Sequence, residues 1–171
     1  MQKKLLIGIM VLAILGSAAY WIFSRLGGNN PIAISLVEKS PEALSGILFK
    51  GTPQDPKLGE SFQKVEDQKS LHPGTFLHTI YEVEPAGKLD TMMVFVGINH
   101  LLVGDEFETR TFQEQRYLLA KITGNNWVMP GPEKVKAKIQ AFADSAQVQL
   151  SGIFIDKIIS EKEVHVLAPI R

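Results

Sequence analysis

The side chains that most often perform chemistry in proteins are scattered along this chain, without the spacing that a catalytic or metal site requires. The four histidines lie far apart, and no two of them have the spacing of metal ligands. Cysteine is absent, which excludes a disulfide framework, a thiolate metal site and a thiol nucleophile. The chain also lacks the G-x-S-x-G motif of serine hydrolases and the G-K-[ST] motif of phosphate-binding loops. We therefore predict no enzymatic activity, no metal site and no cofactor.

The aromatic residues are more informative. Ile80-Tyr81 and Ile153-Phe154 lie in two strand-like segments, at corresponding places in the two halves of the chain, and Trp127 lies in the loop sequence GNNWVMPG. If the halves pack symmetrically, Tyr81 and Phe154 face one central cleft, and Trp127 is able to close over it. An aromatic hollow with few polar groups is typical of a small-molecule site. Core packing explains the same residues without a ligand, so both interpretations stay open.

The elements that must position these residues begin after Pro31 and follow the order strand, strand, helix, strand, strand, which then repeats. Helices are expected to begin at Pro56 and Pro132, because proline is favoured in the first turn and apolar residues recur on one face after each. Apolar and alternating segments predict strands over residues 32–38, 44–50, 75–84, 91–98, 107–112, 116–123, 152–158 and 163–170.

The two runs of elements indicate an internal duplication. Gly51 and Gly124 each end a second strand, and the interval between them equals the interval between the two isoleucine–aromatic pairs. A shared order and spacing of elements is the signature of a repeated unit. We expect one module over about residues 32–100 and the other over about residues 105–171.

An uncharged apolar run, Leu5 to Phe23, precedes these modules. As a helix it would be about 28 Å long, close to the thickness of the hydrocarbon core of a bilayer. A cleaved signal peptide is the competing interpretation, because Ser17-Ala18-Ala19 offers a small-residue cleavage site. The apolar run continues beyond that site, so we predict that residues 1–24 form an uncleaved transmembrane anchor.

The charges around this run predict its orientation. Lys3 and Lys4 precede it and only Arg25 follows it, so the positive-inside rule places the N-terminus in the cytoplasm of a bacterial cell. The rest of the chain would then lie on the periplasmic or outer side of the inner membrane. Residues 25–31, rich in glycine and asparagine, read as a flexible tether. The 18 basic and 18 acidic residues cancel, so no net field attracts nucleic acid.

Four stretches of the chain carry a resemblance to a known family. In order and spacing they resemble the GyrI-like (gyrase-inhibitor-like) effector-binding domain, the sensory half of many AraC- and MerR-type bacterial regulators. The stretches are Lys50-Gly51 with residues 57–64, Thr79 to Pro85, Gly152 to Phe154, and Glu163 to Ile170. The resemblance covers residues 32–171. It implies an α+β fold, in which two βαββ modules pack around a central cleft that binds a small molecule.

Two departures from the family pattern qualify what the resemblance implies. Members that bind lipophilic cations carry a glutamate where this chain has Gly152, so we expect a mostly apolar cleft that favours neutral ligands over cations. Another acid, such as Glu82 or Glu108, would have to replace that glutamate. In addition, the predicted anchor occupies the place of a helix-turn-helix, so we expect no binding to nucleic acid.

Together these observations predict a membrane-anchored, non-catalytic effector-binding module for an apolar or amphipathic small molecule. Three alternatives remain: a hydrolase that opens strained electrophiles in the same cleft, a haem- or tetrapyrrole-binding protein, and an interaction module for a neighbouring membrane protein. The predicted ligand-binding residues are Tyr81, Phe154, Trp127, Glu82 and Glu108.

Overall fold

The computed structural model describes the backbone of residues 2–171 and the side chains of residues 6–171. Within this range the chain forms three helices and eight strands. In chain order they are α1 (Gln2–Arg25), β1 (Ala33–Val37), β2 (Leu44–Gly51), α2 (Pro56–Leu71), β3 (Leu77–Val83), β4 (Met92–Ile98), β5 (Glu108–Arg110), β6 (Tyr117–Thr123), α3 (Pro132–Ser145), β7 (Ile155–Ser160) and β8 (Glu163–Pro169). The predicted α+β class is confirmed, and each predicted strand and helix is present with small shifts of its ends.

The eight strands form one antiparallel sheet in the order β1-β6-β8-β7-β3-β4-β2-β5. The order is symmetric. If β1 to β4 of the first half are matched with β5 to β8 of the second, each strand and its match lie at the same distance from opposite edges. The centre is the β3–β7 pair, in which Thr79 lies opposite Asp156 and Ile80 opposite Ile155. Each edge strand pairs with the other half of the chain, β1 with β6 and β5 with β2. The two halves therefore share one sheet.

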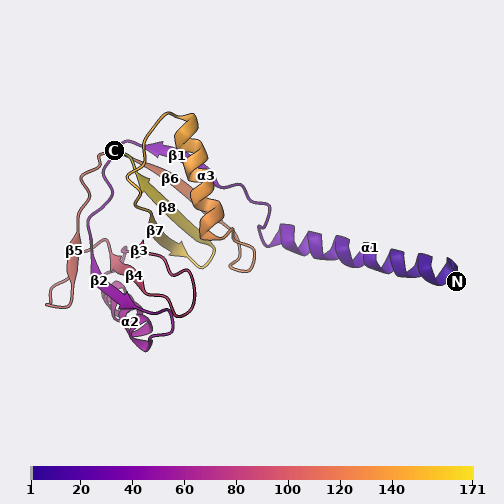
Figure 1. The fold of residues 1–171 in the computed structure, drawn as a ribbon, viewed down its shortest axis with the longest axis horizontal. Helices are drawn as coiled ribbons and strands as arrows, with labels where there is room; N and C mark the ends of the chain where they lie inside the picture. Colours follow the sequence, from indigo (N-terminus) through magenta and orange to yellow (C-terminus); the bar gives the residue numbers. More distant parts are fainter. Residues whose placement is uncertain (1) are drawn as a thin grey trace.

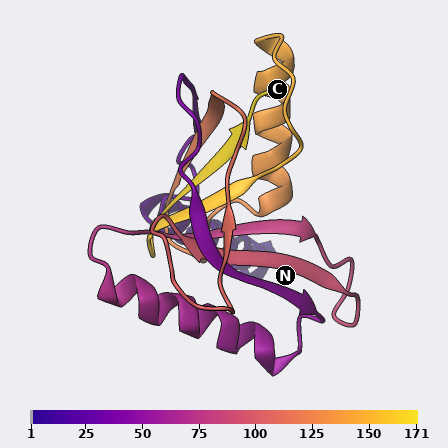
Figure 2. The ribbon, with the colours of Figure 1, turned by 90° about the vertical axis from the view of Figure 1, so that its left-hand side faces the viewer.

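Helices α2 and α3 cover one face of this sheet. Figure 2 shows α2 below the strands of the first half and α3 beside those of the second. Val65 of α2 packs in a buried cluster with Phe49 and Val96, and Ile139 of α3 packs in another with Leu118. Residues paired across neighbouring strands point to the same side of a sheet. The strand register therefore places both clusters on the same face. The two helices thus leave the centre of that face between them.

The ends of α2 and α3 follow local sequence signals. Proline occupies the first turn of both helices. At α2 the Asp55 carboxylate accepts a hydrogen bond of 2.9 Å from the backbone N–H of Lys57 and so caps the helix. At α3 the capping position is Gly131, which has no side chain to accept such a bond. Val135, Ile139 and Ala143 recur at four-residue spacing and form the buried stripe of α3.

Helix α1 projects away from the sheet (Figure 1). Among the described residues it is the one helix that is long and apolar enough to cross a membrane, by length and composition. Its side chains from Leu6 onward are exposed. The side chains of Lys3, Lys4 and Leu5, on which the predicted start and orientation of the span depend, lie outside the described part of the chain.

The connector after α1 is hydrogen-bonded to the sheet domain, although its composition predicts a flexible tether over residues 25–31. The backbone N–H of Asn125 donates to the carbonyl oxygen of Leu26 over 2.8 Å. The amide of Asn30 donates to the carbonyl and to the hydroxyl oxygen of Thr123, over 3.0 and 3.2 Å. These bonds join the connector to the last residue of β6 and to the segment that follows it.

Candidate functional site

A cavity of about 580 Å³ lies on the helix-bearing face of the sheet, between α2 and α3. Phe62 of α2 and Val135 of α3 form opposite walls, and strands β3, β6, β7 and β8 form the floor. The segment between β6 and α3 adds Met129 and Pro130. The volume is within the range of about 300–1,000 Å³ that is usual for small-molecule sites.

Two of the residues predicted from the sequence line this cavity. Tyr81 and Phe154 both contribute side chains to it, from β3 and from the turn before β7. Tyr81 keeps 41 % of its surface exposed, whereas Phe154 also packs against the buried cluster of the second half. Ile80 points to the other face, where it is 7 % exposed in a separate core cluster. The alternation of side chains along β3 therefore assigns Tyr81 to the cavity and Ile80 to the core.

The other three predicted residues lie elsewhere. Trp127 is 91 % exposed and does not line the cavity. Glu82 and Glu108 each contact Arg110 over 2.7 Å, and the Arg110 guanidinium lies 5.5 Å from the centre of the Phe95 ring. Phe95 belongs to the core cluster on the face without helices. Neither glutamate therefore supplies an acid to the cavity.

Two acids do line the cavity, Glu84 after β3 and Asp156 of β7, and sequence reasoning missed Asp156 as a site residue. Within residues 6–171 the Asp156 carboxylate forms no hydrogen bond or ion pair. Burial raises the pKa of Asp156 to about 6, and the positive charge of Lys136 opposes that rise. Burial also raises the pKa of the Tyr81 hydroxyl, and the negative charge of Asp156 adds to that rise. A sequence signal was available, since Asp156 occupies the cavity side of the alternating segment Phe154 to Ile158.

An ion pair lies at the margin of the cavity. The Lys136 amine of α3 contacts the Glu84 carboxylate, which follows β3, and both residues line the cavity. The same amine lies 5.4 Å from the centre of the Phe154 ring. With Asp156 ionised, these three groups sum to one negative charge. The cavity therefore suits a molecule with an apolar body and a cationic or hydrogen-bond-donating group.

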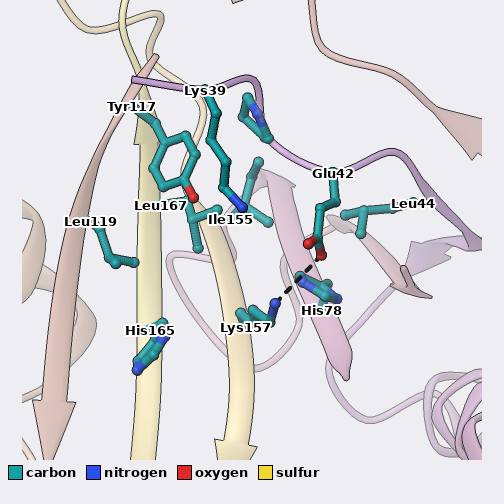
Figure 3. A pocket seen from close by; sticks show the side chains of 11 residues that line it. Lys39, Glu42, Leu44, His78, Tyr117, Leu119, Ile155, Lys157, His165 and Leu167 are labelled. Atoms are coloured by element: carbon teal, nitrogen blue, oxygen red, sulfur yellow. Dashed lines mark hydrogen bonds and ion pairs between the residues drawn. The ribbon is translucent and has the colours of Figure 1, made fainter. Parts of the chain in front are cut away.

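A second hollow, of about 70 Å³, lies on the opposite face of the sheet (Figure 3). Its polar lining includes Lys157, whose amine is 3.5 Å from the Glu42 carboxylate. His78 is 2 % exposed there, its Nδ1 donates to the carbonyl oxygen of Phe76, and burial lowers its pKa to about 4. This hollow is too small for the ligands that typical binding pockets enclose. The helix-face cavity is therefore the better candidate site.

The histidines do not form a metal centre in the part of the chain that the structure describes. His72 and His100 stack with their ring centres 4.1 Å apart, and His165 contacts Glu163 over 2.6 Å. No group of three or more histidine, aspartate or glutamate side chains among these residues could hold a metal ion.

No protein-family model and no curated protein matches this chain. Solved structures do resemble it. A hydrolase from Listeria innocua has a TM-score of 0.57 at 7 % identity, over 82 % of this chain and 92 % of its own. The C-terminal domain of EcmrR has a TM-score of 0.53 at 10 % identity, over 82 % and 97 %. An integron cassette protein from Vibrio cholerae has a TM-score of 0.50 at 13 % identity, over 83 % and 97 %.

At such low identities these similarities concern the fold alone. The single antiparallel sheet with its helices on one face is consistent with the GyrI-like fold that the sequence resemblance implies. The neighbours themselves differ in kind, because one is described as a hydrolase and another is a domain of EcmrR. The function of this chain must therefore be argued from its own cavity.

Proposed function

We propose that this chain is a membrane-anchored, non-catalytic module that binds a small molecule, as an effector, in the helix-face cavity. The observation that carries the proposal is the Asp156 carboxylate, half-buried in an otherwise largely apolar cavity of drug-sized volume. The likeness of the fold to the EcmrR C-terminal domain supports a sensory role of the kind that the sequence resemblance implies.

The ligand that fits best is amphipathic. Tyr81, Phe154 and Met129 offer apolar and aromatic surface to its body. An ionised carboxylate in such surroundings is costly unless a ligand or a protein group compensates its charge. A cationic group placed at Asp156 would supply that compensation and lower the pKa of Asp156 again. This proposal replaces the preference for neutral ligands that Gly152 suggests in the sequence.

The anchoring and the duplication are parts of the same proposal. The exposed apolar surface of α1 and its length support a single crossing of a bacterial inner membrane. The flanking charges, Lys3 and Lys4 before the apolar run and Arg25 after it, support a sheet domain on the outer side. The symmetric strand order supports an origin by internal duplication. In that arrangement the cavity lies over the junction of the two halves, where β3 meets β7.

A pair of isosteric probes tests the binding proposal. Phenyltrimethylammonium and tert-butylbenzene have nearly the same shape but differ in charge. We expect calorimetric titration of the full chain in lipid nanodiscs, with protein-free nanodiscs as the blank, to show tighter binding of the cation. Asp156→Asn should remove that difference. Glu108→Gln, which neutralises an acid outside the cavity, should preserve it. Absence of binding by both probes, or equal binding by the wild type, would contradict the proposal.

A second candidate function is the hydrolysis of a strained electrophile in the same cavity. A carboxyl group with a pKa of about 6 is suited to general acid–base catalysis near neutral pH, and the structural neighbours include proteins described as hydrolases. In this reaction water adds across the carbon–oxygen bond of an epoxide and yields a diol. An aryl glycidyl ether, assayed for its diol with the wild type and with Asp156→Asn, distinguishes the candidates. Turnover that depends on Asp156 would replace the non-catalytic proposal.

A further inference from the structure

The most exposed aromatic residue of the sheet domain is Trp127, which retains 91 % of its surface. It lies in a short segment between β6 and α3, residues 125–129, which we call the tryptophan loop. The loop is ordered by its own bonds: the Asn125 side chain accepts from the N–H of Trp127 over 3.1 Å, and its carbonyl accepts from the N–H of Met129 over 3.0 Å. An ordered loop thus holds a large apolar ring away from the protein.

The tryptophan loop is attached to the end of α1. Its first residue, Asn125, donates its backbone N–H to the carbonyl oxygen of Leu26 over 2.8 Å. Gly27, which follows Leu26, has a φ of +89°, and a Cβ atom built there would lie 3.0 Å from the Cα of Gly124. Glycine is therefore favoured at position 27 for two reasons, its positive φ and the close approach of the Gly124 backbone. The loop is held at the level of the last turn of α1.

That level corresponds to a membrane interface if α1 spans the bilayer. Trp21 and Tyr20, which are 60 % and 65 % exposed, are the residue types that favour the interface. Leu26 follows Trp21 by five residues, or about 7.5 Å along a helix axis. The interfacial layer of each leaflet is itself about 5–8 Å thick. The guanidinium of Arg25, which lies 4.9 Å from the Trp21 ring, is then placed among the headgroups.

We propose that the tryptophan loop is a second membrane contact, in which the Trp127 ring lies among the lipid headgroups on the domain side of the bilayer. This inference rests on the proposed anchoring of α1. The partner is the lipid interface, because the loop offers an amphipathic ring with an N–H at its edge, which suits that environment better than bulk water. It explains why Trp127 is exposed and does not close the cavity.

The contact has a consequence for the cavity. The residues after Trp127 include Met129 and Pro130, which belong to the cavity wall. A docked loop therefore holds that wall against the bilayer surface. A ligand that partitions into the membrane reaches the site from the interface, where its local concentration is higher than in water. The ligand class that follows is a membrane-soluble amphiphile with its cationic or donor group toward Asp156.

Tryptophan fluorescence in vesicles tests the contact. Trp21 and Trp127 are the two tryptophans of the chain, so Trp127→Phe leaves Trp21 as the only emitter, and Trp21→Phe leaves Trp127. The full-length variants are reconstituted in phosphatidylcholine vesicles with and without lipids brominated close to the headgroup. We expect both variants to emit at shorter wavelength than tryptophan in water and to lose intensity with brominated lipid.

A third variant is the matched control. Val103 is 92 % exposed in the segment that leads to β5, at the sheet edge opposite β1. In the background lacking both native tryptophans, Val103→Trp should emit as in water and show no quenching. Quenching of Trp21 without quenching of Trp127 would overturn the inference and leave the anchor in place. Absence of quenching at both positions would overturn the anchor as well.

Discussion

Asp156, which is half-buried, and His78, which is buried, lie on opposite faces of the sheet, and their pKa values shift in opposite directions. Burial disfavours the charged form of each, so it raises the pKa of the acid and lowers the pKa of the base. Each group responds to its own neighbours, Lys136 for Asp156, and Lys157 with Glu42 for His78. The pH dependence of stability therefore contains two contributions of opposite sign.

The variant Asp156→Asn tests the contribution of Asp156 to the pH dependence of stability. The pKa rises from 3.8 to about 6 on folding, so between these values the folded state retains a proton that the unfolded chain has lost. This contribution to stability falls as pH rises through that window, by at most about 3 kcal/mol. The variant should match the wild type near pH 4 and exceed its unfolding free energy at pH 8 by about 1–3 kcal/mol. Urea unfolding at the two pH values measures this, and an equal effect at both would refute the assignment.

For His78 we predict the reverse with His78→Asn, which keeps a donor for the carbonyl oxygen of Phe76. The pKa of His78 is about 4 in the folded state and 6.5 in the unfolded chain, so between these pH values the unfolded chain binds a proton that the folded state does not. The wild-type contribution therefore rises with pH over this range, by at most about 3 kcal/mol. The variant should lose less stability than the wild type when the pH is lowered from 7 to 4. Identical acid sensitivity in thermal melts would show that His78 titrates normally.

Substitutions at the consecutive residues Ile80 and Tyr81 distinguish a core residue from a cavity residue. Ile80→Ala should lower the unfolding free energy by about 2–5 kcal/mol, because Ile80 is buried among large side chains. Tyr81→Ala should cost less stability but weaken probe binding, because its ring borders the cavity. Phe154→Ala should do both, since it packs on the core and lines the cavity. If Tyr81→Ala destabilises as much as Ile80→Ala and no probe binds, Tyr81 is a core residue.

At the scale of elements, α2 and α3 begin with the same proline signal but differ in capping. Asp55→Ala should destabilise the protein by about 1 kcal/mol, because it leaves an N–H of the first turn without its acceptor. Gly131→Asp should instead stabilise it by a few tenths of a kcal/mol, because the position has an extended backbone and open space for a side chain. Chemical unfolding measures both. A loss of stability in Gly131→Asp would mean that the new carboxylate does not cap α3.

In the molecule as a whole, α1 and the sheet domain are joined by hydrogen bonds as well as by the connecting chain. Leu26 contacts Asn125 in the segment between β6 and α3, and Asn30 contacts Thr123 at the end of β6. This arrangement limits how far the domain can tilt away from the end of α1. It also determines which surface of the domain faces a membrane, if α1 lies in one. The position of the cavity relative to the bilayer is then a property of the fold.

The orientation of the anchored molecule gives the last prediction. Lys3 and Lys4 precede the apolar run and Arg25 follows it, so the domain should lie outside the cytoplasm. Alkaline phosphatase fused after Arg171, which requires an oxidising compartment, should be active in a bacterial host. β-Galactosidase at the same place should be inactive. The opposite pattern of activities would place the domain in the cytoplasm.

Much of this architecture could be predicted from local sequence. Strand β2 ends at Gly51 and β8 at Pro169, α2 and α3 begin at Pro56 and Pro132, and alternation along β3 places Tyr81 and Ile80 on opposite faces. These features depend on backbone geometry and on the burial of one face, which a short segment specifies by itself. The class of the fold and the places of Tyr81 and Phe154 in the cavity followed from the sequence for this reason, whereas Trp127, which was expected to close over it, lies outside.

The charges of the site were decided by tertiary structure. Glu82 and Glu108 carry the same carboxyl group as Asp156, but they lie on the other face, where both contact Arg110, which the pairing of β5 with β2 brings there. Asp156 becomes the unpaired acid of the cavity because Lys136 of α3 contacts Glu84 instead, and neither α2 nor α3 gives Asp156 a hydrogen-bonding partner. Burial and charge pairing depend on residues far away in sequence. A pattern read along one strand therefore shows where an acid points, and only the packed fold determines what surrounds it.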